Sequence, residues 1–194
     1  MDGLVYLKST RKLTDEEIKH WHILTKEDEV QFPVIDYAGK YCFTVKRLLS
    51  GKRSYDYPSD APVGFRLFGL DHAVQPIIEE GCAIIVEGPF DVIAMHSIGF
   101  TNTVGALSNN LTRWQALQLR RWTNRLVFVL DGDDGGREGL KQTVKVLQAN
   151  FDFTFTAVKL STGDPDSYVR TGAIKPTLLK AVGNAIKKVR NNGN

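Results

Sequence analysis

The sequence predicts an α/β protein: a four-stranded parallel sheet flanked by helices, preceded by a smaller mixed α+β region. From residue 82 onward, four short apolar segments alternate with segments of helical periodicity about ten to fifteen residues long, which is the pattern of βαβ units. The apolar segments are continuous, as expected for strands that are covered on both faces of a sheet.

The first eighty residues are expected to form the smaller region. Thr14 followed by Glu17 has the pattern of a capping box and opens a predicted helix. The elements expected here are a helix over 15–22, a hairpin of strands 32–37 and 41–47 turning at 38–40, an irregular segment over 59–70, and a helix over 71–80 ending at Gly81.

The remaining residues carry the alternating elements. The strands are expected at 82–88, 102–107, 125–131 and 153–160, and the helices at 89–99, 111–124, 135–151 and 176–190. Thr112 or a neighbour is expected to open the second helix, and the last helix is basic and amphipathic. We therefore divide the chain into residues 1–80, 81–172 and 173–194.

Composition is that of a soluble globular protein, with 42% hydrophobic and 24% charged residues. The net charge is only +3, but its distribution is uneven: Lys40 to Arg66 holds six basic residues and two acids, and Ala173 to the end holds five basic residues and no acid. Separate basic and acidic zones suit a protein that holds a polyanion on one surface and a cation on another, although solvated faces would look the same.

Cys42 and Cys82 are too few for a disulfide framework, and neither has the spacing of a zinc site, so no zinc is expected. Their apolar surroundings predict small buried residues. Because there is no signal pattern and the longest apolar run, 82–86, is too short to cross a bilayer, we expect an intracellular, cytoplasmic protein without membrane contact.

Three groups of acidic residues follow three of the predicted strands. They are Glu87 with Asp91, Asp131 with Asp133, and Asp164 with Asp166. Because the carboxyl ends of parallel strands meet at one edge of a sheet, these six side chains should converge. Like charges held close together need protonation or a counter-cation, and oxygen ligands without His or Cys favour Mg²⁺ or Mn²⁺.

The acidic residues also have simpler interpretations. Asp91 or Asp164 alone would be a helix cap, and Asp134, outside the Asp131–Asp133 alternation, is expected to be one. An EF-hand is a poor alternative, because Gln142 would stand at the position of its bidentate Glu. A haloacid-dehalogenase-type phosphatase would have a Thr soon after its second Asp, where this chain has glycines.

The combination of motifs resembles the TOPRIM domain of primases, topoisomerases and several nucleases. VEGPFD at 86–91 and VLDGDDGG at 129–136 are similar to its two signature motifs, and DPD at 164–166 follows the fourth strand. The flanks resemble the catalytic core of bacterial DNA primases at 32–36 with Gly39, at 52–55, at 68–70 with Ala73, and at 163–172. The resemblance covers roughly residues 10–172.

This resemblance implies a TOPRIM fold and a primase that joins ribonucleoside triphosphates into RNA primers on a single-stranded DNA template. The implied catalytic residues are Glu87, Asp131 and Asp133, and the implied ligands of two Mg²⁺ or Mn²⁺ ions are Glu87, Asp91, Asp131, Asp133, Asp164 and Asp166. Glu87 is either a ligand or the base for the 3′-hydroxyl. Nucleic acid or nucleotide phosphates are expected at Arg47, Lys52, Arg53 and Arg66, with Tyr55 and Tyr57 stacking on bases.

The chain also departs from the family. Neither the zinc-binding module nor the helicase-interaction domain is expected in this sequence, so a replicative helicase and a separate zinc module are expected partners, as in a phage or mobile-element replication protein. Ser108-Asn109-Asn110 stands where many such primases have Gly-Thr. A TOPRIM nuclease and a non-catalytic nucleic-acid-binding remnant remain open alternatives. Trp114 and Trp122, two helical turns apart, are expected in the core, and the four histidines are expected to be structural.

Overall fold

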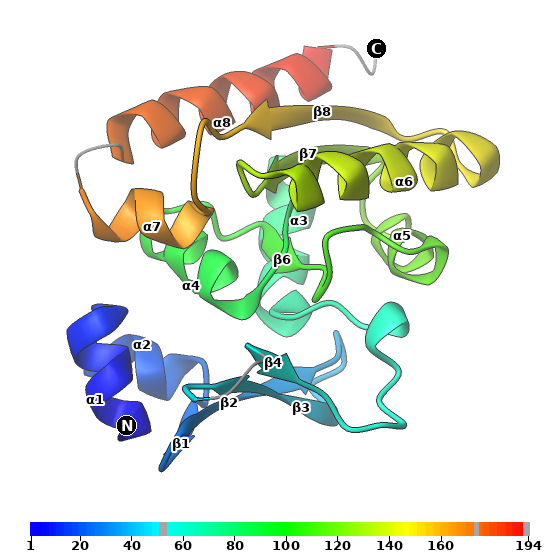
Figure 1. Cartoon of the computed structure of the whole chain (residues 1–194). Helices are drawn as coiled ribbons and strands as arrows, with labels where there is room; N and C mark the ends of the chain where they lie inside the picture. Colours follow the sequence, from blue (N-terminus) through cyan, green and yellow to red (C-terminus); the bar gives the residue numbers. More distant parts are fainter. Residues whose placement is uncertain (51–53, 173–174, 192–194) are drawn as a thin grey trace.

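Two four-stranded sheets organise the chain (Figure 1). The structure is a computed structural model that describes residues 1–50, 54–172 and 175–191. The second sheet is formed by β5 (Ala83–Val86), β6 (Thr103–Gly105), β7 (Arg125–Leu130) and β8 (Thr154–Lys159). Its order is β6-β5-β7-β8 and all three pairings are parallel, which confirms the predicted sheet.

Helices cover both faces of this parallel sheet. They are α3 (Leu70–Glu80), α4 (Pro89–Ser97), α5 (Arg113–Leu119), α6 (Asp134–Asn150), α7 (Pro165–Arg170) and α8 (Lys175–Asn191). Alternate strand residues point to opposite faces: Ile84 and Val127 pack with α4, α7 and α8, whereas Ile85 and Phe128 pack with α3, α5 and α6. Each such fully buried side chain stabilises the fold by about 1.5–3 kcal/mol relative to an exposed one. Both faces of the sheet are covered, so residues on both faces of each strand are apolar.

The first sheet is antiparallel. It is formed by β1 (Leu24–Lys26), β2 (Glu29–Ile35), β3 (Tyr41–Leu48) and β4 (Tyr55–Asp56), and it follows α1 (Gly3–Val5), the π-helical turn η1 (Tyr6–Thr10) and α2 (Asp15–His20). Burial alternates along β2, as the β-rich run predicts. The buried side chains Val30, Phe32 and Val34 belong to the same apolar cluster as Ile84 of β5, so the two sheets share one core.

Residues that were predicted to begin or end helices do so in the structure. Thr14 and Glu17 form the predicted capping box of α2, and Thr112 with Gln115 forms another at α5. Gly81 ends α3 in the left-handed conformation, with φ at 64°. The 3₁₀ turn η2 (Val63–Phe65) lies in the segment that was expected to be irregular. The short elements α1, η1, β1, β4 and α7 carry no periodicity and were not predicted. The division at residues 80 and 172 remains a proposal.

One core prediction is wrong. Trp114 is 47% exposed, and Trp122 is half-buried. The spacing of two helical turns would place both tryptophans on one face only if the helix continued, but α5 ends at Leu119 and Trp122 lies beyond it.

Cys82 is buried, Cys42 is half-buried and both are free thiols. Of the helices that the structure describes, none has the length and apolarity needed to cross a membrane.

Candidate active site

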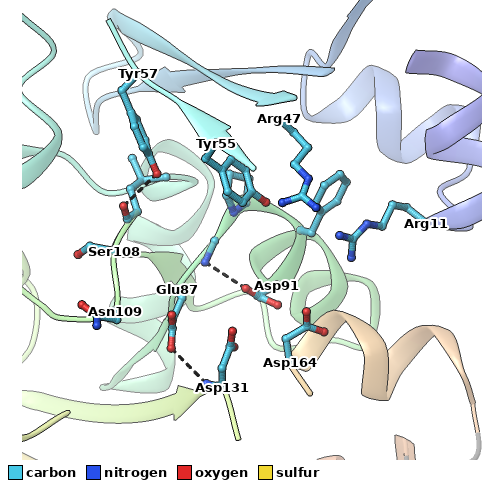
Figure 2. Close-up of a pocket in the computed structure, with 14 residues that line it drawn as sticks. Arg11, Arg47, Tyr55, Tyr57, Glu87, Asp91, Ser108, Asn109, Asp131 and Asp164 are labelled. Atoms are coloured by element: carbon cyan, nitrogen blue, oxygen red, sulfur yellow. Dashed lines mark hydrogen bonds between the residues drawn. The ribbon is translucent and has the colours of Figure 1, made fainter. Parts of the chain in front are cut away.

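A pocket of about 310 Å³ lies between the carboxyl edge of the parallel sheet and strand β4. We call it the acidic pocket. It is lined by Arg11, Arg47, Tyr55, Tyr57, Glu87, Gly88, Pro89, Phe90, Asp91, Leu107, Ser108, Asn109, Asp131 and Asp164. Figure 2 shows the four acids on one side and the two arginines and two tyrosines on the other. The parallel register explains the acidic side, because β5 pairs with β7 and the residues that follow both strands reach the same edge.

Glu87 and Asp131 meet directly across the ends of these two strands. The Asp131 backbone N–H donates to Glu87 Oε1 at 3.2 Å, as Figure 2 shows. Burial raises the pKa of Glu87, and the carboxylates of Asp133 and Asp164 raise it further. Burial also raises the pKa of Asp131, to about 7, with Glu87, Asp164 and Asp133 adding to the effect. The carboxyl groups of Glu87 and Asp131 are therefore harder to ionise than carboxyl groups in water.

Asp131 also has an unused acceptor. Its Oδ1 is buried and has no hydrogen-bond partner among the described residues. Leaving a buried acceptor unpaired usually costs about 1–3 kcal/mol. An unpaired buried oxygen surrounded by further carboxylates is a good environment for a hard cation, so the donor set fits Mg²⁺ or Mn²⁺.

Asp91 and Asp164 line the pocket but are tied to the backbone. Asp91 accepts hydrogen bonds from Gly88 N at 3.0 Å and from Asp166 N at 3.3 Å. Burial raises the pKa of Asp91 well above its usual range, and the charges of Asp131 and Asp164 raise it further. Asp164 caps α7 by accepting from Ser167 N at 2.7 Å. Asp91 and Asp164 therefore each cap the start of a helix and also line the pocket.

Asp133 is the N-cap of α6, the role that was predicted for Asp134. It caps α6 by accepting from Gly136 N at 2.8 Å, while Asp134 lies in the first turn, is 96% exposed and pairs with Arg137. The prediction that Asp134 is the cap is therefore wrong. Asp133 does not line the acidic pocket, but its charge raises the pKa of both Glu87 and Asp131, so it lies near the acids.

Asp166 is engaged by two arginines instead of facing the pocket. Its Oδ2 lies 2.7 Å from Arg11 and its Oδ1 lies 3.3 Å from Arg170, and only 3% of its side chain is exposed. Arg170 also pairs with Glu17 of α2 at 3.0 Å. This geometry favours an ion pair that joins α7 to the N-terminal helices over the predicted role of Asp166 as a metal ligand.

The predicted basic residues are dispersed. Arg47 lines the acidic pocket, with its guanidinium 5.0 Å from the ring centroid of Tyr55. Its Nε–H is buried and has no acceptor among the described residues. Lys52 and Arg53 lie outside the described residues. Arg66 does not line the acidic pocket: it contacts Cys42 Sγ at 3.1 Å and lines a second pocket beside α5, so its predicted role in binding phosphates stays a prediction.

Arg11 is a pocket residue that sequence reasoning missed. Its side chain lies between Tyr6 Oη, at 2.8 Å, and Asp166, and its guanidinium is 4.4 Å from the ring centroid of Phe90. Arg11 and Asp166 are 155 residues apart, and no local pattern marks either as the partner of the other.

The remaining wall is a strained loop after β6. Leu107 has a left-handed φ of 60°, which is uncommon for a branched side chain. Two bonds hold it: Leu107 N donates to Glu87 O at 2.8 Å, and Tyr57 Oη donates to Leu107 O at 3.1 Å. Asn109 Nδ2 donates to Gly135 O at 3.2 Å. The loop is thus positioned from both sheets and from α6.

Gly139→Ala is expected to destabilise the protein by about 1–3 kcal/mol, because a Cβ at this buried position of α6 would overlap the carbonyl oxygen of Asn109. Urea denaturation measures the change. Gly183→Ala in α8 is the matched control: no atom lies within 4 Å of its Cβ position, so the helix should gain about 0.5–1 kcal/mol. Equal effects of the two substitutions would contradict the close approach of the Asn109 loop to α6.

No three metal-binding side chains within 1–50, 54–172 and 175–191 are grouped tightly enough to hold an ion by themselves. This agrees with the usual behaviour of Mg²⁺, which is bound by one or two carboxylates and completed by water and substrate phosphates.

Comparisons with known proteins agree with these motifs. Residues 81–158 match the model of the Toprim domain. The DNA primase of Clostridium acetobutylicum is 34% identical over 165 residues, which are 82% of this chain and 27% of that protein. The DNA primase of Aquifex aeolicus is 34% identical over 146 residues, which are 73% of this chain and 29% of that protein.

A solved structure gives the same result. The crystal structure of the Aquifex aeolicus primase, comprising zinc-binding and RNA polymerase domains, superposes with a TM-score of 0.71 at 30% identity, over 84% of this chain and 42% of that one. The chain spans roughly a quarter of the length of the two curated relatives. The predicted resemblance to primase cores is therefore confirmed.

Proposed function

The chain contains a Toprim domain within the fold of bacterial DNA primase cores, and from this premise we propose that it synthesises short RNA primers on single-stranded DNA. One observation carries the proposal. The buried Asp91 and the half-buried Glu87, Asp131 and Asp164 face a pocket whose opposite wall holds Arg11, Arg47 and two tyrosines. Such a pocket suits metal-dependent transfer of a nucleotide.

We propose that Glu87, Asp131 and Asp164 hold divalent ions, Mg²⁺ or Mn²⁺, with Asp91 and Asp133 adding negative charge nearby. Two ions would supply electrophilic stabilisation of the attacking and leaving oxygens of phosphoryl transfer. Asp131 Oδ1, which has no hydrogen-bond partner in the described part of the chain, is the best-placed ligand atom. The raised pKa of Glu87 equally supports a role as base for the primer 3′-hydroxyl, so both roles stay open for this residue.

The opposite wall would bind the substrates. Arg11 and Arg47 bring two positive charges to face the acids, and phosphoryl transfer depends mainly on such positioning and charge neutralisation. The Nε–H of Arg47, which has no acceptor in the described part of the chain, is available for a phosphate oxygen of template or nucleotide. Tyr55 lies in β4 of the antiparallel sheet and Tyr57 follows that strand, and Tyr55 presents a ring beside Arg47.

We also propose that initiation depends on a zinc-binding module in addition to residues 1–194. The support is the Aquifex aeolicus primase structure, which comprises a zinc-binding domain together with its RNA polymerase domain. A replicative helicase is a second proposed partner, which follows from the primase assignment alone.

The test is primer synthesis on single-stranded DNA with labelled ribonucleotides and Mg²⁺, with Asp131→Ala and Glu87→Ala as inactive variants. Asp134→Ala is the matched control, because this acid lies in the same turn but is 96% exposed. Shortened template in place of extended products would identify a nuclease. No product from wild type, with or without an added zinc module, would overturn the primase proposal.

Arg47→Ala is expected to weaken single-stranded DNA binding and to reduce the slope of log K against log[salt] by about 0.7, the share of one phosphate contact. A salt titration of fluorescence anisotropy measures both quantities. Arg190→Ala is the control, since Arg190 of α8 pairs with Glu80 of α3 and neither residue lines the acidic pocket. An unchanged slope for Arg47→Ala would remove this residue from the nucleic-acid contacts.

A further inference from the structure

A second pocket of about 390 Å³ lies beside α5 and is lined by exposed aromatic side chains. We call it the aromatic pocket. Its lining residues are Asp36, Tyr37, Phe65, Arg66, Trp114, Leu117, Gln118 and Arg121. Tyr37 and Phe65 are each 44% exposed and Trp114 is 47% exposed. Soluble proteins rarely leave several large apolar side chains grouped at the surface unless the group binds something.

The rings are already arranged for stacking. Phe65 and Trp114 are stacked, with centroids 5.2 Å apart and planes inclined by 20°. Backbone contacts fix this pair: Gln118 Nε2 donates to Phe65 O at 2.5 Å and Gln115 Nε2 donates to Arg66 O at 2.7 Å, which fastens η2 to α5. The segment that carries Phe65 therefore needs little ordering when a ligand binds.

Positive charge surrounds the rings. Arg121 lies 4.5 Å from the ring centroid of Tyr37, and Arg113 lies 5.7 Å from a ring centroid of Trp114. Arg66 lines the same pocket. The acid in the lining, Asp36, is used in the hairpin turn, where its Oδ1 accepts from Ala38 N at 2.9 Å and from Lys40 N at 3.0 Å.

Stacked aromatic rings bordered by arginines bind single-stranded nucleic acid, because rings stack on bases of any sequence while arginines bind phosphates. A purely apolar peptide would gain nothing from three arginines. The charge of the rim therefore favours a nucleic-acid strand over a protein segment.

The aromatic pocket is close to the acidic pocket along the chain. Asn109 lines the acidic pocket and Trp114 lines the aromatic one, five residues later, so their Cα atoms are at most about 18 Å apart. A strand that leaves the acidic pocket would need only a few nucleotides to reach Trp114.

We propose that the aromatic pocket stacks one or two bases of the single-stranded template, a few nucleotides away from the acidic pocket. The identity of the strand as template rests on the proposed function. The binding itself does not, because it depends only on the rings and arginines.

The experiment is titration of a labelled oligothymidylate with the full chain, without nucleotides or metal. Trp114→Ala and Phe65→Ala are each expected to lower the affinity about tenfold, and Trp114→Phe, which keeps a ring, should lose much less. Leu117→Ala is the matched control, because Leu117 is 48% exposed in the same pocket but has no ring, and its affinity should change less than twofold. Melting temperatures establish that each variant is folded.

Unchanged affinity in folded Trp114→Ala and Phe65→Ala would overturn the proposal, and a protein segment would then be the better occupant. Equal losses in Trp114→Ala and Leu117→Ala would also overturn it, because stacking would not be the cause. Failure of primer synthesis by a wild type that still binds the strand through Trp114 would reject the proposed function and leave this inference standing.

Discussion

Asp131→Asn is expected to reduce primer synthesis about a hundred- to a thousandfold while making the metal-free protein more stable. The activity falls because a neutral amide holds a cation poorly. The stability rises because the substitution removes one of several like charges whose burial is unfavourable. Relief of about 1–2 kcal/mol would raise the melting temperature by roughly 2–8 °C in a chain of this size.

The pH dependence of this effect has a definite sign. The pKa of Asp131 rises from 3.8 to about 7 on folding, so between these pH values the folded state binds more protons than the unfolded state. The free energy of unfolding of the metal-free protein therefore falls as pH rises from about 4 to about 7, and this contribution stays lost above pH 7. The raised pKa values of Glu87 and Asp91 act in the same direction.

Scanning calorimetry at pH 5 and pH 8 measures the effect as a difference between variants. The gain of Asp131→Asn over wild type should be larger at pH 8, and added Mg²⁺ should stabilise wild type more than the variant. Asp134→Asn serves as the control, because its exposed side chain should give no such difference. A gain independent of pH would mean that the repulsion among the acids is not its source.

Asp166→Asn should instead destabilise the protein strongly, by about 3–5 kcal/mol or roughly 6–20 °C in melting temperature. Arg11 and Arg170 have only 20% and 15% of their side chains exposed, so removal of the carboxylate leaves two partly buried cations without their shared partner. The stabilisation by Mg²⁺, measured as the shift in melting temperature, should stay close to that of wild type.

The matched control is Asp152→Asn. Asp152 also pairs with an arginine, Arg120, but it is 72% exposed, and such surface pairs contribute at most about 1 kcal/mol. The opposite pattern for Asp166→Asn, a small loss of stability and a large loss of Mg²⁺ response, would restore this residue to the predicted metal ligands.

The parallel sheet and the convergence of four of the six acids on one pocket could be predicted because both depend on local signals. Apolar runs locate the strands, and parallel strands bring Glu87 and Asp131 to one edge wherever the rest of the chain lies. The identity of the helix cap could not be settled in the same way. Asp133 and Asp134 are both suitable caps, and the choice between them depends on where α6 begins.

The other wall of the pocket depends on contacts between distant segments. Arg11 enters it because η1 packs near α7, and its partner Asp166 is 155 positions away. Arg66 is close in sequence to Tyr55 and Tyr57, but the chain turns towards α5 after β4 and carries it to the aromatic pocket. Trp114 is exposed because α5 buries Gln115, Ala116 and Leu119 and leaves Trp114 on its other face, which the spacing of the two tryptophans does not reveal.

The apolar cluster shared by the two sheets has a consequence for cooperativity. Val30 and Phe32 of the antiparallel sheet lie in one cluster with Ile84 and Val86 of β5. A chain cut at residue 80 would expose this side of the cluster to water, so the acidic edge of the parallel sheet and the strands that precede it are expected to fold and unfold as one thermodynamic unit. Stability lost anywhere in the antiparallel sheet is then also lost at the acids.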